Sequence, residues 1–85
     1  MNAPFVLTAH AKLEMIRRQI PLAWLDACMQ LPEQIVEGTG RRKIFQSRFA
    51  QEGKVFLLRV VVETWQAPPV VVTVYRTTRL EKYLE

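Results

Sequence analysis

The chain has 85 residues, a length that fits one domain, so we expect a single domain over residues 1–85. Hydrophobic residues make up 49% of the chain and charged residues 24%, which excludes a disordered protein and a simple coiled coil. The net charge of +4 favours a polyanionic partner, RNA or DNA first, although it also fits an acidic protein partner or a plain solubility surface.

One cysteine and one histidine are too few for an intrachain disulfide or for a metal site rich in Cys or His, so no metal or other cofactor is expected. The N-terminal residues lack the basic start and the apolar run of a secretory signal. No apolar stretch approaches the ~20 residues that cross a bilayer. The sequence therefore predicts no membrane partner and a cytoplasmic location, where a single reduced cysteine is ordinary.

Two amphipathic helices are predicted in the first third of the chain. Thr8 is suited to be the N-cap of a helix over 9–19, and Pro21 is suited to the first turn of a second helix over 21–30. Helical spacing predicts which apolar residues face the core: Ala9, Leu13, Ile16 and Ile20 in the first helix, and Leu22, Leu25, Cys28 and Met29 in the second.

Beyond residue 33 the hydrophobic period changes from helical to alternating, which predicts strands over 34–37, 42–49, 54–64 and 70–77. Gly53 is placed for the positive φ of a hairpin turn between the second and third strands. Residues 80–84 form a short tail that could be helical. The expected fold is α+β, with two N-terminal helices packed on one face of a four-stranded antiparallel sheet and a short C-terminal tail.

The second face of this sheet is predicted to be partly open and polar. Arg59 interrupts an apolar central strand, and a charge there is costly unless it is paired or meets a polyanion. Alternation places further polar residues on the same face: Arg42, Gln46, Arg48, Thr73 and Tyr75. Such a surface could hold phosphates through charge-assisted hydrogen bonds. The alternative is structural, with Arg59 paired to Glu63 or Glu37, or with its stem packed and its head in water.

His10 is the natural candidate for a general acid or base, because imidazole is the side chain that exchanges protons most readily near neutral pH. Cleavage of RNA by its own 2′-hydroxyl needs a base, an acid and a cation beside the phosphate, and it needs no metal. The structural alternative is that Glu14, one helical turn further on, simply holds the imidazole.

The chain resembles a family of small bacterial proteins catalogued as domain of unknown function 4258. Its opening Leu7-Thr8-Ala9-His10-Ala11, followed by Met15, Arg18 and Ile20, is similar to the family pattern L-T-x-H-A-x-x-x-M-x-x-R-x-I. The later matches are Leu31-Pro32-Glu33, Leu58-Arg59-Val60-Val61-Val62, Val72-Thr73-Val74-Tyr75 and Lys82-Tyr83. Two departures are Glu14, where a basic residue is common, and Gln19-Ile20-Pro21, which replaces the usual Gly-Ile-Ser.

That family is similar to RelE-like and BrnT-like toxins of the barnase–EndoU–colicin–RelE ribonuclease superfamily. The resemblance implies the same α+β fold, metal-independent RNA cleavage and control by a cognate antitoxin protein. The predicted catalytic residues are His10, Arg59 and Tyr75. The predicted RNA-binding residues are Arg18, Arg42, Arg48, Thr73, Lys82 and Tyr83.

Three functions therefore compete. The first is a toxin-like endoribonuclease that acts on the polar sheet face. The second is a non-catalytic basic module that binds RNA or an acidic protein. The third is a structural role, bound to an antitoxin or as a homodimer, with the strand over 34–37 or 42–49 as a pairing edge.

Overall fold

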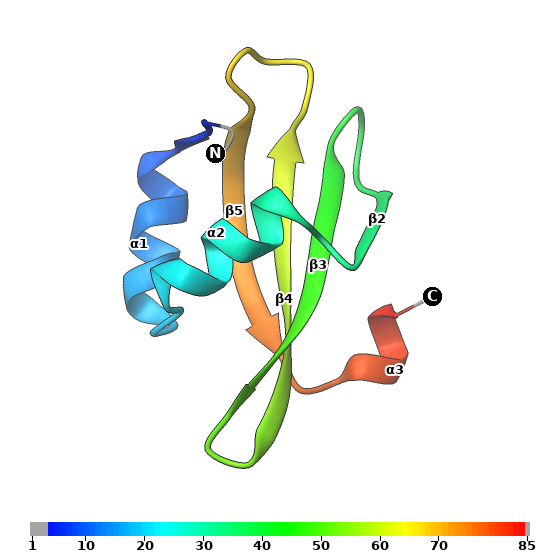
Figure 1. Cartoon of the computed structure of the whole chain (residues 1–85). Helices are drawn as coiled ribbons and strands as arrows, with labels where there is room; N and C mark the ends of the chain where they lie inside the picture. The colour runs from blue at the N-terminus through cyan, green and yellow to red at the C-terminus, as the bar shows by residue number, and fades with distance from the viewer. Residues whose placement is uncertain (1–3, 85) are drawn as a thin grey trace.

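The computed structural model describes residues 4–84, and Figure 1 shows their arrangement. A twisted sheet is flanked by two helices from the N-terminal third of the chain and by one helical turn at the C-terminal end. The elements in chain order are β1 (Val6–Leu7), α1 (Ala9–Arg17), α2 (Leu22–Gln30), β2 (Gln34–Glu37), β3 (Lys43–Gln51), β4 (Lys54–Glu63), β5 (Val70–Thr77) and α3 (Leu80–Tyr83).

The sheet has five strands in the order β1-β5-β4-β3-β2, so the prediction of a four-stranded antiparallel sheet is wrong. The additional strand β1 pairs in parallel with β5, with Val6 opposite Val70. The backbone bonds from Val6 N to the Pro69 carbonyl (2.9 Å) and from Thr8 N to the Val71 carbonyl (3.1 Å) hold it there. Two residues are too few to show strand alternation, which is why the sequence pattern gave no sign of this strand.

The four remaining strands lie close to the predicted ranges, but a register shift between Val61 and Val62 lets both Val71 and Val74 of β5 face the core. The bounds of β2 and β5 are those predicted, and β3 extends two residues further, to Gln51. The β3–β4 hairpin turns through Glu52 (φ 51°) and Gly53 (φ 78°), both left-handed, and this confirms the role expected of Gly53. Each strand of the hairpin thus runs to the turn without a break.

Local signals place the starts of both helices. The Thr8 hydroxyl accepts a hydrogen bond from Ala11 N (3.0 Å) and donates one to the Val72 carbonyl (2.9 Å), so the N-cap also fastens α1 to β5. Helix α1 ends at Arg17, and the left-handed Gln19 (φ 52°) stops it two residues before the predicted end. Pro21 is the N-cap of α2 rather than its first residue.

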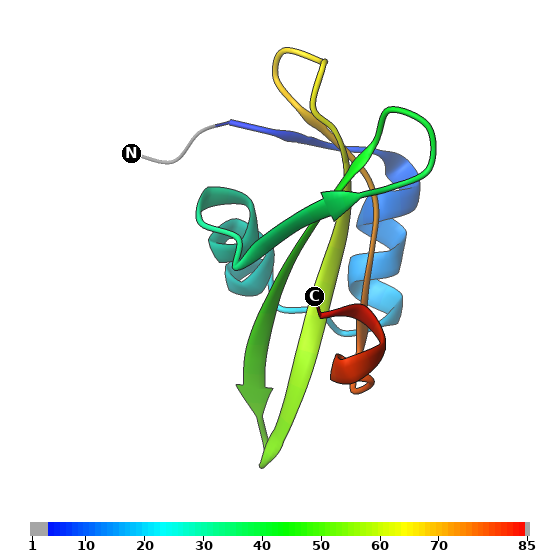
Figure 2. The ribbon, with the colours of Figure 1, turned by 90° about the vertical axis from the view of Figure 1, so that its right-hand side faces the viewer.

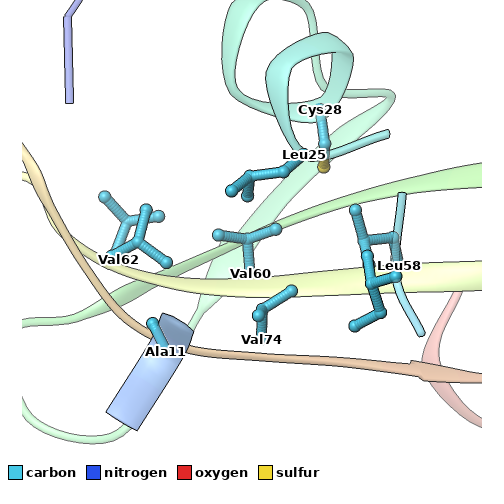
Figure 3. Packing of buried hydrophobic residues seen from close by; sticks show 9 residues of the cluster. Ala11, Leu25, Cys28, Leu58, Val60, Val62 and Val74 are labelled. Atoms are coloured by element: carbon cyan, nitrogen blue, oxygen red, sulfur yellow. The ribbon is translucent and has the colours of Figure 1, made fainter. Parts of the chain in front are cut away.

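The core lies between the sheet and the two N-terminal helices, with α1 beside β5 and α2 across β4 and β3 (Figure 1). Figure 3 shows side chains from both helices meeting the valines and leucine of the sheet. The residues of β4 that alternate with Arg59 face this core, and Leu58, Val60 and Val62 are fully buried. The cluster consists of Ala11, Ile20, Leu25, Cys28, Leu58, Val60, Val62, Val71 and Val74.

The predicted core stripe of α1 is wrong in part. Leu13 is 55% exposed and Ile16 is 75% exposed, whereas Ala11 is fully buried. In α2, Leu22 is 61% exposed, while Leu25 and Cys28 are buried as expected. A small residue at position 11 lets α1 approach β5 closely, and that approach turns the larger apolar residues outward. Among residues 4–84, no helix is long and apolar enough to cross a membrane.

Cys28 should be chemically inert in the folded protein. Burial raises the pKa of its thiol to about 11, and its side chain is inaccessible. At pH 8 only about 0.1% of such a thiol is thiolate, the reactive form. We expect iodoacetamide to leave the native protein unmodified over an hour while it alkylates the urea-unfolded chain completely, as mass spectrometry would record. Rapid labelling of the native protein would mean that α2 detaches readily from the sheet.

The face of the sheet opposite α2 is called the open face here. Figure 2 shows α2 on one side of β4 and α3 on the other. The tail predicted over 80–84 therefore does form a helical turn, and it lies on the open face rather than in solvent.

Candidate functional site

A row of four polar side chains crosses the open face at one level. The strand register places Gln34 opposite Gln46, Gln46 opposite Arg59, and Arg59 opposite Tyr75. These four residues are called the polar row. Each comes from a different strand, from β2 through β5, so the pairing of the whole sheet fixes their spacing.

Arg59 is the centre of the polar row and is only 9% exposed. Its Nε donates to the Gln46 side-chain carbonyl (2.9 Å), and its Nη1 donates to the Tyr75 hydroxyl (2.5 Å). No carboxylate of residues 4–84 forms an ion pair with it: Glu63 pairs with Arg42, and Glu37 pairs with Lys43. The two structural ion pairs considered for Arg59 are therefore not formed, and a buried positive charge lacks a counter-ion within the described chain.

The guanidinium also keeps hydrogen-bonding capacity. It carries five N–H groups, and two of them have acceptors among residues 4–84. No buried side-chain nitrogen or oxygen in the described part of the chain lacks a partner, so the unpaired Nη2 must reach the surface. An anion arriving at the open face would find unused donors on a cation, which is the arrangement that binds phosphate most strongly.

Gln46 holds Arg59 in place and is itself fully buried. Its Oε1 accepts from Arg59, and its Nε2 donates to the Gln34 side-chain carbonyl (2.7 Å) and to the backbone carbonyl of Tyr83 (3.1 Å). The amide therefore uses both of its donor hydrogens and its acceptor. The strand alternation placed Gln46 on this face, but nothing in the sequence marked it as the residue that orients Arg59.

Tyr83 covers the centre of the polar row from α3. The Arg59 Cζ lies 4.1 Å from the centroid of the Tyr83 ring, a cation–π contact, and the Tyr75 and Tyr83 rings meet edge to face at 6.4 Å. Lys82 is exposed, with its Nζ 5.3 Å from the same ring centroid. Of the predicted RNA-binding residues, Tyr83 is thus the one in contact with Arg59.

His10 lies at the β5 edge of the open face. Its Nε2 is 3.1 Å from the Thr73 hydroxyl, which brings together two predicted site residues that are 63 positions apart. The residue expected to hold His10 in the structural alternative, Glu14, instead bonds Arg17 (3.0 Å) and Arg18 (2.7 Å). Thr73 and Tyr75 are two residues apart on one strand face, about 7 Å, so His10 approaches the polar row at Tyr75.

The three arginines predicted to bind RNA all form ion pairs. Arg18 pairs with Glu14, Arg42 with Glu63 (3.0 Å) and Arg48 with Glu33 (2.8 Å). Hydrogen bonds from Arg18 and from Arg48 lower the pKa of Glu14 and of Glu33 respectively. Hydrogen bonds from Gln66 and then from Arg42 lower the pKa of Glu63. These three cations are therefore paired with carboxylates, whereas Arg59 is not paired with any carboxylate of residues 4–84.

The shape of the site is shallow. No enclosed pocket occurs within the part of the chain that the structure describes, and in that part no three His, Cys, Asp or Glu side chains are grouped as metal ligands would be. The predicted catalytic residues therefore lie on a surface, with Arg59 joined directly to Tyr75 and His10 joined to Thr73 beside it.

Comparison with known proteins identifies the family. No curated protein and no solved structure matches the chain. One family model, described as a domain of unknown function (DUF4258), matches residues 7–76, which include His10 and the whole polar row. Because this match spans most of the sequence, the chain belongs to the DUF4258 family.

Proposed function

We propose that the protein is a toxin-like, metal-independent endoribonuclease that binds an RNA phosphodiester at Arg59 on the open face. The observation that carries the proposal is the buried Arg59 guanidinium, which has no carboxylate partner among residues 4–84 and has unused donors. Proteins rarely bury an unpaired charge unless a ligand compensates it. A phosphate diester supplies the negative charge and the acceptor oxygens that Arg59 lacks.

The neighbouring side chains suit cleavage by the substrate's own 2′-hydroxyl. In that reaction a bond forms between the 2′-oxygen and phosphorus while the bond to the 5′-oxygen breaks, which leaves a 2′,3′-cyclic phosphate. His10 would accept the 2′-hydroxyl proton through its ring, which Thr73 orients. Tyr75 accepts a hydrogen bond from Arg59, so its own proton is available for the departing 5′-oxygen. Arg59 would stabilise the charge that develops on the phosphoryl oxygens.

A non-catalytic RNA-binding module is the second candidate, and one observation favours it. The site has no enclosed pocket in the described residues and Tyr83 lies against Arg59, which is a poor arrangement for excluding water from a reacting phosphate. Such a module would use Arg59 in the same way but would leave the RNA intact. The toxin-like character and a cognate antitoxin partner remain predictions from the family resemblance.

Cleavage of RNA by the purified protein tests the proposal. With 5′-labelled RNA and excess EDTA, we expect fragments ending in 2′,3′-cyclic phosphate from the wild type. Arg59→Gln should cleave about 100-fold more slowly or worse, as expected when a group that stabilises developing charge is removed. His10→Asn and Tyr75→Phe should each lose at least about tenfold, because general acids and bases commonly contribute 10²–10⁴-fold.

Lys54→Gln is the matched control for Arg59→Gln. It also removes one positive charge, but from the exposed hairpin end of β4, five residues along the strand from Arg59. Its cleavage rate should stay within about twofold of the wild type, because exposed charges act weakly at a distance in salt. Binding without cleavage, lost only in Arg59→Gln, would favour the non-catalytic module. Equal binding and cleavage by the wild type and Arg59→Gln would refute the role of Arg59 in both functions, and a wild type that neither binds nor cleaves RNA would refute the functions themselves.

A further inference from the structure

The helical turn α3 lies beyond the region that the family model matches. The family match ends at residue 76, just before β5 ends, and α3 begins at Leu80. Yet Tyr83 of this turn packs against Arg59, which lies inside the matched region. A segment beyond the matched region therefore covers the central cation of the polar row.

The attachment of α3 to the sheet is slight. Four residues make a single turn, and a turn this short is not stable without tertiary contacts. It has no side-chain N-cap, and both Glu81 and Lys82 are exposed. The hydrogen bond and the ring contacts that join residues 80–83 to the open face all belong to Tyr83: its ring lies against Arg59 and Tyr75, and its backbone carbonyl accepts from Gln46. Segments with so few contacts open at low free-energy cost.

The same contacts occupy the place where an anion would bind. The Tyr83 ring lies over the guanidinium, and the Arg59 Cζ is only 4.1 Å from the ring centroid. The ring therefore shields that side of Arg59. A ring quadrupole is a weak substitute for a full negative charge, so an arriving phosphate would compete with Tyr83 on favourable terms. Because the ring covers one side of the guanidinium, the ring and a phosphate that approaches from that side each weaken the binding of the other.

We propose that α3 is a displaceable cover that inhibits the Arg59 site, and that a phosphodiester oxyanion binds there by displacing Tyr83. This inference rests on the proposed function for its ligand, RNA, although the cover itself requires only a phosphate group. Tyr83 then regulates access to Arg59. The sequence predicted a different role for Tyr83, direct contact with the RNA.

Two point variants test the cover. Point variants are preferred to a deletion of 80–85, because Leu57 on the open face is fully buried and a deletion could expose it. Tyr83→Ala removes the ring, while Tyr83→Phe keeps the ring and its contact with Arg59. The ligand is a dodecamer of 2′-O-methyl RNA, which cannot be cleaved because its nucleophile is blocked. Tyr83→Ala should bind it at least about fivefold more tightly than the wild type, and Tyr83→Phe within twofold of the wild type. Equal or weaker binding by Tyr83→Ala would overturn the cover and return Tyr83 to the RNA contacts.

A second measurement follows the ring directly. The chain has only two tyrosines, so ¹³C-tyrosine labelling gives two ring signals, which Tyr83→Phe assigns. The edge-to-face pair of Tyr75 and Tyr83 should give an inter-ring nuclear Overhauser effect in the free protein. Inorganic phosphate should abolish that effect, while sodium chloride at the same ionic strength should not.

These readouts separate the two proposals. Loss of the inter-ring effect with phosphate, together with no binding of RNA, would support the cover and refute the RNA function. Binding and cleavage of RNA with the inter-ring effect intact would support the function and refute the cover.

Discussion

Replacing Leu25 by alanine is expected to lower the free energy of unfolding by about 2–5 kcal/mol, the usual range for a buried leucine. Leu25 is fully buried and is the side chain of α2 that lies among the valines of the sheet (Figure 3). Domains of this size are commonly stable by only about 5–15 kcal/mol, so this single change removes a large share of the total. The melting temperature should fall by roughly 8–40 °C, at about 4–8 °C for each kcal/mol in a domain of this size.

Leu22→Ala is the control for this prediction. The residue is on the same helix and the chemical change is identical, but the side chain is 61% exposed. The expected change is within about 0.5 kcal/mol, as for most surface substitutions. Urea unfolding followed by tryptophan fluorescence would measure both variants. Equal losses at the two positions would contradict the orientation of α2 and would restore the inward position that helical spacing predicted for Leu22.

The contrast between these leucines shows what periodicity can and cannot predict. Alternation in the strands was sufficient to place Leu58, Val60 and Val62 in the core, because a strand has only two faces. In α1 an apolar stripe was available through Leu13 and Ile16, and the protein instead packs the helix through Ala11. Which face of α1 packs on the sheet depends on how the helix lies against β5. That arrangement is a tertiary property, and the spacing of apolar residues within the helix does not determine it.

The candidate site was also predictable only in part: the strands could be placed from the sequence, and the contacts between distant elements could not. Strand parity put Arg59, Thr73 and Tyr75 on one face, and the register of β4 and β5 brings Arg59 and Tyr75 together. The partner of His10 could not be predicted, because Thr73 lies 63 residues away and depends on how α1 meets the sheet edge. The ion pairs of Arg42 and Arg48 depend in the same way on which carboxylates the fold brings near.

The remaining prediction concerns the stability of the polar row. Gln46→Leu should lower the free energy of unfolding by about 2–4 kcal/mol, because it leaves the Nε of a buried guanidinium without an acceptor, and hydrogen bonds to charged groups are worth more than neutral ones. It also removes the bonds to Gln34 and to the Tyr83 carbonyl. Arg59→Met leaves the fully buried Oε1 of Gln46 without its donor, so it should also lower the free energy of unfolding, by about 1–3 kcal/mol.

The double variant decides between a structural and a ligand-binding reason for Arg59. With Arg59 already replaced by Met, Gln46→Leu should cost at least about 1 kcal/mol less than in the wild type, because no buried charge is left unpaired. Chemical denaturation of the four proteins closes this cycle. If Arg59→Met alone costs more than about 3 kcal/mol, the upper end for one unsatisfied buried group, Arg59 is needed to hold the sheet together. If Arg59→Met costs less than that and abolishes RNA binding, the chain keeps a buried cation for what binds to it rather than for its own stability.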